Sequence, residues 1–346
     1  MDQNVFYTRF GSGVNFGGWL SQCEGRAADP AHWDTFITRK DVEAVARWGF
    51  THVRLPVDAM YFEKDGVLLE EGLCRIDRAL DWCFAAGLRV VLDLHQAPGY
   101  SFNTLKENCL FDNAVLQDRF VSLWEGLARR YRGIGEELAF ELLNEIVEPK
   151  PDRWNALALR TVSAIRGIDP NRVIIVGGIN YNAVSRLADI CDFGDPLVVY
   201  NFHFYEPMLF THQLAGWNQL TLHYGKHTAY PSVFPGVAEF IKQHPEYEYA
   251  SWCADRVMDQ DVLSQQLVPA REFAAKTGNA LYCGEYGVIE HADADSRRNW
   301  HRDLCRLLDE LKVARACWSY KGMDFGLFDD NAEPLDETLV RITAGK

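Results

Sequence analysis

The 346-residue sequence lacks several patterns that would place it in a specialised class of protein. It contains no C-x-x-C pair, which disfavours zinc ribbons and thioredoxin-like redox motifs. No apolar run approaches the roughly 18 residues of a membrane span, and no low-complexity tract or charge block interrupts the chain. Basic residues are not in excess, and the formal net charge is -14. The electric field of a negatively charged protein repels phosphate backbones and acidic membrane surfaces. We therefore expect neither nucleic acid nor a membrane as a partner, and the acidity leaves the oligomeric state open.

The nine cysteines are odd in number, scattered, and mostly embedded in apolar segments such as 281–283 and 316–318. Buried free thiols are the simpler interpretation, and they suggest a reducing compartment. The first residues show no basic region followed by an apolar stretch, so no signal peptide is visible. We expect a cytoplasmic protein as the sequence stands, although a secreted protein whose leader has been removed would look the same.

The dominant feature of the sequence is a repeated alternation of short apolar runs with helical stretches. Helical periodicity predicts helices over residues 39–48, 75–86, 114–131, 154–166 and 296–311. Between and around them lie eight strand candidates, at residues 13–17, 52–55, 88–94, 138–143, 173–176, 197–202, 280–283 and 314–318. Strands alternating with helices indicate a parallel sheet, and eight of them fit a closed barrel. The prediction is a (β/α)8 TIM barrel in one domain spanning residues 1–346, with a doubly wound open sheet as the alternative.

The interval between Phe204 and Leu281 breaks this rhythm, because it is much longer than one helix and two loops need. It is rich in aromatic residues and histidine. Long loops in compact domains are usually functional, and in barrels the loops after strands form the site. We interpret the interval as an elaborated loop after strand six, with helices over the barrel mouth.

Polar residues follow six of the apolar runs, at the strand ends where a barrel carries its chemistry. They are Arg54, His95, Asn144, Glu145, His203, Tyr205, Glu285 and Trp318. Glu145 and Glu285 are the most informative, since each follows a strand otherwise too apolar to tolerate a charge. A glycosidase needs one carboxylic acid to protonate the leaving oxygen and a second carboxylate as nucleophile or base. Strands four and seven lie across a barrel mouth from each other, so these two glutamates could flank one scissile bond.

These residues resemble glycoside hydrolase family five, also called cellulase family A. The resemblance rests on Arg54 in 52–56, His95 in 93–99, Asn144-Glu145, His203 and Tyr205 in 203–205, Glu285 in 284–287, and Trp318. Their order and approximate spacing agree with the family over about residues 13–328. The family usually has proline directly after the acid/base glutamate, whereas Ile146 stands here and the proline comes at Pro149. Glu148-Pro149 could be mistaken for the motif, but Asn144 and the strand before it favour Glu145.

The resemblance implies a role for each residue. Glu145 would be the general acid/base with a raised pKa, and Glu285 the nucleophile, kept ionised by Arg54 and hydrogen-bonded by Tyr205. Asn144 would hold the sugar 2-hydroxyl. His95 and His203 would position sugar hydroxyls or the acid/base, and Trp318 would stack under the sugar ring at the cleavage site.

The implied activity is retaining hydrolysis of β-glycosidic bonds in a β-glucan-type polysaccharide or oligosaccharide, without a cofactor or metal. An endo-β-1,4-glucanase is the activity the family suggests first; β-mannanase, xyloglucanase and exo-β-glucosidase activities stay open because loops set specificity. A metal-dependent hydrolase using His95, His203 and Glu285 is disfavoured by the lack of an H-x-H pair. A carbohydrate-binding barrel without turnover is the non-enzyme alternative.

Three further patterns in the sequence have possible functional interpretations. The glycines of 11–17 approach a dinucleotide fingerprint, but the third comes one place too late and no helix clearly follows. His223 and His227 have metal-ligand spacing for a helix, yet Gly225 between them favours a surface or substrate-loop role. Trp217, inside the long interval, is the best candidate for a sugar-stacking subsite.

Overall fold

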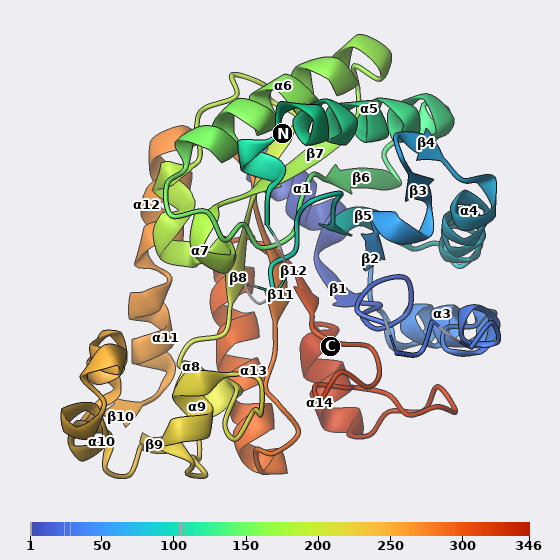
Figure 1. Ribbon diagram of the computed structural model, residues 1–346. Coiled ribbons are helices and arrows are strands. Elements are labelled where there is room, and N and C mark those ends of the chain that lie inside the picture. Colours follow the sequence, from blue (N-terminus) through green and yellow to red (C-terminus); the bar gives the residue numbers. More distant parts are fainter. Residues whose placement is uncertain (1, 24, 28, 104–105, 107) are drawn as a thin grey trace.

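Eight parallel strands close into a barrel that is surrounded by helices, as Figure 1 shows. The computed structural model describes residues 2–23, 25–27, 29–103, 106 and 108–346. The barrel strands are β1 (Ser12–Asn15), β2 (His52–Asp58), β5 (Arg89–Gln96), β6 (Leu138–Glu141), β7 (Val173–Gly177), β8 (Val198–Phe204), β11 (Leu281–Tyr286) and β12 (Ala314–Cys317). The sheet runs in the order β1-β12-β11-β8-β7-β6-β5-β2, and β1 pairs in parallel with both β12 and β2. Because the ends of the sheet meet, the predicted single-domain (β/α)8 barrel is confirmed and the open sheet is wrong.

Helices cover the outside of the barrel. They include α3 (Arg39–Trp48), α4 (Glu70–Ala85), α5 (Ala114–Tyr131), α6 (Asp152–Ile168), α12 (Val268–Thr277), α13 (Ala294–Glu310) and, near the C-terminus, the short α14 (Glu337–Thr343). All five predicted helices are present, with two at the predicted bounds. α4 begins at Glu70 rather than at Arg75, and its first turn includes Gly72. A Cβ at Gly72 would lie 2.0 Å from the carbonyl oxygen of Tyr61, so the position needs glycine. The interior glycine, which normally lowers helix propensity, here allows close packing.

Shorter elements fill the connections. They are α1 (Gln3–Phe10), α2 (His32–Thr35), α7 (Ile179–Asn182), α8 (Met208–Thr211), α9 (Gln219–Tyr224), α10 (Val237–Gln243), α11 (Gln260–Gln266), the 3-10 helices η1 (Ala59–Tyr61), η2 (Leu110–Asp112), η3 (Val184–Asp189) and η4 (Pro245–Cys253), and the two-stranded pairs β3 (Glu63–Lys64) with β4 (Val67–Leu68) and β9 (Ser232–Val233) with β10 (Val257–Met258). Within the described part of the chain, no helix has both the length and the apolar character that crossing a membrane requires. No disulfide joins the nine cysteines, all of which lie among the described residues.

The barrel interior has two layers of side chains with different chemistry. The layer nearer the start of the strands is mostly apolar, with one polar pair formed by His52 and the Tyr282 hydroxyl (2.9 Å). α1 closes it from below by packing Phe6 and Phe10 against inward-facing residues such as Val91 and Tyr282. Two residues further along the strands, and therefore on the same face, the side chains are polar: Asn15, Arg54, Asp93, Glu141 and Asn201, all fully or almost fully buried. The sequence did not predict α1, which begins at the N-cap Asp2.

The long interval after β8 forms a lobe rather than a simple cover over the mouth. In Figure 1, α9, α10, β9 and β10 stand together at the lower left, beside the lower part of α13. Its first part borders the mouth, because Ala215 packs in one cluster with Trp318 and Phe325. Its later part is anchored to α13, where the Tyr230 hydroxyl donates to Asp303 (3.0 Å).

Candidate active site

Arg54 on β2 is the centre of the polar layer. Its guanidinium is completely buried and holds both oxygens of Glu141 in a two-pronged ion pair, with Nε to Oε2 at 2.7 Å and Nη2 to Oε1 at 2.8 Å. Nη1 donates to Oε1 of Glu285 at 2.7 Å and to Asn15 at 2.9 Å. A paired guanidinium of this kind fixes both the position and the charge of its partners. One cation therefore connects β1, β2, β6 and β11.

The same guanidinium also contacts the residues on β5 and in the loop after β6. Nη2 donates to Asn144 Oδ1 at 2.9 Å and lies 3.0 Å from Asp93 Oδ2. The amide oxygen of Asn144 is thus occupied, and its NH2 group lies 3.5 Å from His95 Nε2, which leaves one of its two N–H groups as a donor for a ligand. Burial raises the pKa of Asp93 to about 7, although Arg54 opposes the rise. Three carboxyl groups, those of Asp93, Glu141 and Glu285, thus surround Arg54. Its single positive charge cannot neutralise all three if each is ionised.

Glu285 lies at the end of β11 between two hydrogen-bond donors. Arg54 donates to Oε1, and the Tyr205 hydroxyl donates to Oε2 at 2.9 Å. Burial raises the pKa of Glu285 above its usual value, while His203 and Arg54 oppose that rise. Both donors stabilise the carboxylate form, so the structure gives Glu285 the two contacts predicted from the sequence.

Glu145 follows β6 in a strained loop. Its φ of 41° is uncommon for a residue with a side chain and is the kind of strain that collects at functional sites. The Tyr100 hydroxyl holds this loop by donating to the carbonyl of Glu145 at 2.5 Å and accepting from the backbone N–H of Val147 at 3.1 Å. Ile146, which directly follows Glu145, forms an isolated parallel bridge with Ile179. Burial raises the pKa of Glu145 to about 7, so its carboxyl group is partly protonated near neutral pH.

His203 on β8 joins the two glutamates. Its Nδ1 lies 2.9 Å from Glu145 Oε1 and 3.7 Å from Glu285 Oε2. Burial lowers the pKa of His203 to about 4, so the ring is neutral at pH 7. Nε2 lies 3.3 Å from the amide nitrogen of Asn182. With the Asn182 amide N–H donating to Nε2, the proton of the neutral ring is on Nδ1, and this Nδ1–H donates to Glu145.

His95 and Trp318 form one wall of the site. His95 Nδ1 lies 2.7 Å from Asp93 Oδ2, and its ring is nearly parallel to that of Trp318, with the centroids 5.8 Å apart. Gly17 makes room for the tryptophan, since a Cβ there would lie 2.7 Å from the indole ring. The stacking of Trp318 under a sugar remains a prediction.

The structure brings together all the predicted site residues except Trp217. That side chain is 57% exposed, and no contact among the described residues joins it to the site, although Ala215 two positions earlier packs near Trp318. Its role as a subsite therefore remains a prediction. Glu148, the alternative acidic residue, lies outside the network and pairs with Arg153 at 2.6 Å.

Five buried polar residues of the site were missed from the sequence: Asn15, Asp93, Glu141, Asn182 and Asn201. Asp93 and Asn201 lie inside β5 and β8, and Asn15 and Glu141 end β1 and β6, which are shorter than the predicted strands 13–17 and 138–143. A usable signal was present for two of them, because a lone acid interrupts the apolar runs 89–94 and 138–143. Asn182 gave no such signal, because its contact with Gly177, where a Cβ would lie 2.3 Å from the Asn182 amide oxygen, appears only in the structure.

Glu145, His203 and Glu285 could in principle hold a metal ion, as one ligand atom from each lies within 4.8 Å of the other two. The guanidinium of Arg54, 2.7 Å from Glu285, already places a positive charge there. A divalent cation would have to displace or repel it. The donor set therefore fits acid/base chemistry better than the metal-dependent alternative.

Comparisons with known proteins agree with this geometry. The family model described as Cellulase (glycosyl hydrolase family 5) matches residues 13–324. The chain is 45% identical to Endoglucanase C of Acetivibrio thermocellus, over 97% of this chain and 98% of that protein. It is 35% identical to Cellodextrinase A of Ruminococcus flavefaciens, over 88% and 84% of the two chains. The structure of endoglucanase Cel5A from Thermotoga maritima has the same fold, with a TM-score of 0.80, 24% identity and 99% of each chain covered. The chain belongs to glycosyl hydrolase family 5.

Proposed function

We propose that this protein is a retaining endo-β-1,4-glucanase that uses Glu145 as the acid/base and Glu285 as the nucleophile. The observation that carries the proposal is the spacing and unequal surroundings of the two carboxylates. An oxygen of one lies within 4.8 Å of an oxygen of the other. Retaining glycosidases have carboxyl groups about 5–5.5 Å apart, whereas inverting enzymes need roughly 6.5–9.5 Å to admit water. The close pair supports retention.

The surroundings assign the two roles. Glu285 accepts from a guanidinium and a phenol, which stabilise an anion ready to attack the anomeric carbon. Glu145 has no guanidinium on its carboxylate among the contacts of the described residues, and burial raises its pKa to about 7. It can therefore hold a proton for the departing oxygen, then accept one from water in the second step. The neutral Nδ1–H of His203 orients one oxygen of Glu145 throughout.

The substrate is proposed from the relatives. A 45% identical relative is named an endoglucanase and a 35% identical one a cellodextrinase. Soluble β-1,4-glucan chains and short cello-oligosaccharides are therefore the first substrates to test. The second N–H of Asn144, beside the one directed at His95, would donate to the sugar 2-hydroxyl, a contact that strengthens in the transition state.

Three measurements test the proposal. NMR spectra recorded during the first minutes of cello-oligosaccharide hydrolysis should show the β-anomer as the first product, and first appearance of the α-anomer would contradict retention. Hydrolysis of soluble glucan should lower viscosity well before most bonds are cut. Release of glucose alone from chain ends would instead indicate exo-glucosidase activity. Activity should survive a strong chelator, and its loss would favour the metal-dependent alternative.

A further inference from the structure

The lobe after β8 carries a cluster of three side chains that the glycosidase chemistry does not use. His223 lies near the end of α9, His244 is the C-cap of α10, and Glu246 lies in η4. One ligand atom of each residue lies within 4.8 Å of the other two. We propose that these three side chains bind a divalent transition-metal ion of the zinc class.

The donor set suits such an ion. Imidazole nitrogen and carboxylate oxygen are ordinary zinc ligands, at about 2.0–2.2 Å, and a tetrahedral site places neighbouring ligand atoms roughly 3.3 Å apart. His244 Nδ1 and Glu246 Oε1 are already 3.2 Å apart. To bind the ion, the ligand atom of His223 has to move closer to the other two ligand atoms by about 1 Å or more. Rotation of side chains on the protein surface can supply this movement. Water would occupy the remaining position.

Neighbouring aromatic residues hold both imidazoles in place. The rings of His223 and His244 are stacked, with centroids 5.5 Å apart and planes 24° from parallel. Phe240 packs 5.0 Å from His244, and the Tyr247 hydroxyl lies 2.8 Å from Nδ1 of His223. When Nδ1–H donates to this hydroxyl, the lone pair of Nε2 is left for an ion. Zinc-bound histidines usually have an outer hydrogen bond of this kind, which fixes the ring and its tautomer.

Comparison with the other two candidate clusters favours this one. In the cluster of Glu70, Cys74 and Asp77, the guanidinium of Arg130 contacts both carboxylates, at 2.6 and 2.5 Å. In the catalytic cluster, Arg54 contacts Glu285. No lysine or arginine of the described chain forms an ion pair with Glu246. A metal ion at the lobe therefore meets a carboxylate that no guanidinium or ammonium neutralises.

An ion at this position would join α9 to the α10–η4 junction across the lobe. Trp217 directly precedes Asn218, the N-cap of α9. The ion would thus brace the segment that begins at the predicted sugar-stacking tryptophan. The site is separate from catalysis, so its failure would leave the proposed glucanase activity untouched.

Titration of the full chain with cobalt(II), a spectroscopic substitute for zinc, tests the proposal. We expect one ion per chain, visible absorption bands of nitrogen and oxygen coordination, and displacement by one equivalent of zinc. His223→Ala and His244→Ala should each lower the affinity by about tenfold or more, and Tyr247→Phe by about tenfold. Circular dichroism should show that the surface variants remain folded.

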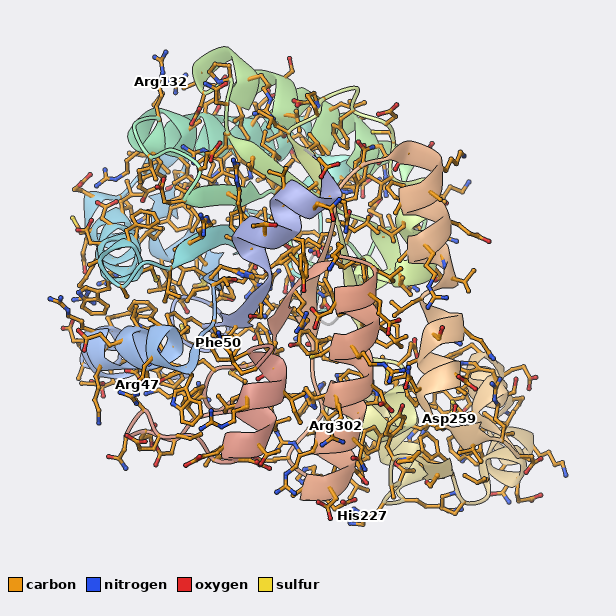
Figure 2. The ribbon with its side chains drawn as sticks, turned by 180° about the vertical axis from the view of Figure 1, so that it is seen from behind. Arg47, Phe50, Arg132, His227, Asp259 and Arg302 are labelled. Atoms are coloured by element: carbon orange, nitrogen blue, oxygen red, sulfur yellow. The ribbon has the colours of Figure 1, made fainter. Side chains whose placement is uncertain are left out.

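His227→Ala is the matched control, because His227 is an exposed histidine of the same lobe outside the cluster. Figure 2 shows it at the lower edge of the molecule. It should bind cobalt as the unaltered chain does. Equal binding by His244→Ala, absence of saturable binding, or a thiolate charge-transfer band that disappears in Cys74→Ser would each overturn the proposal.

Discussion

The two layers inside the barrel come from the same strands but have opposite chemistry. Along β5 the inward side chain changes from Val91 to Asp93 within two residues, and along β6 it changes from Ala139 to Glu141. Both layers are fully enclosed. The lower one is stabilised by apolar packing against α1, whereas each group of the upper one needs a hydrogen bond or an opposite charge.

The difference shows how the fold supports the site. The apolar layer tolerates changes that preserve volume, because packing has no required partner. The polar layer does not, since removing one member leaves another charge buried and unpaired. We therefore expect changes in the lower layer to affect stability alone, and changes in the upper layer to affect stability and chemistry together.

The largest effect should come from Glu285→Gln in the upper layer. The amide keeps the shape of the side chain but cannot attack the anomeric carbon, so kcat should fall by about 10⁴-fold or more. Steady-state hydrolysis of a cello-oligosaccharide measures the loss. Glu148→Gln, which alters the surface pair with Arg153, should retain full activity. Near-normal turnover by Glu285→Gln would overturn the assignment.

Glu141→Leu should cause the next largest effect, on stability. It leaves the buried guanidinium of Arg54 without its two-pronged partner, at a cost of about 3–5 kcal/mol in the free energy of unfolding. Denaturant titration measures this cost. Glu43→Leu removes a surface partner of Arg39 and should change stability by less than about 1 kcal/mol. Equal effects of the two changes would contradict the role given to the polar layer.

Phe10→Ala tests the lower layer. Removing a fully buried ring from the α1 plug should lower the free energy of unfolding by about 3 kcal/mol. The pH dependence of kcat/KM should stay unchanged, because no charge near the glutamates is altered. A displaced pH profile would show that the two layers are not independent.

The smallest expected effect is a shift in the pH profile. Glu145 must be protonated for the first step, and its pKa is about 7, so kcat/KM should fall as the pH rises through that value. The charge of Glu141 contributes to the raised pKa of Glu145. Glu141→Gln removes that charge, so the alkaline limb should move to lower pH by roughly half a unit. A shift to higher pH would contradict this sign.

Much of the barrel and part of the site could be predicted from the sequence. The eight strands were found because a buried parallel strand is continuously apolar, and the polar groups after such runs must meet at one end of the barrel. Arg54, Glu145 and Glu285 were found in this way. Asn182 could not be, because its position depends on three consecutive residues with positive φ after β7.

The order of apolar and polar segments by itself determined the alternation of strands and helices and the positions of the two glutamates, since burial and strand direction follow from local pattern. Closure of the sheet was decided by the pairing of β1 with β12 and β2. The sequence did not show how charge is shared among the buried groups. Only the tertiary structure decided that Arg54 divides its donors between Glu141 and Glu285, and that His203 links the two catalytic glutamates. These contacts join residues far apart in the chain, and their energies depend on distances and burial that only packing sets.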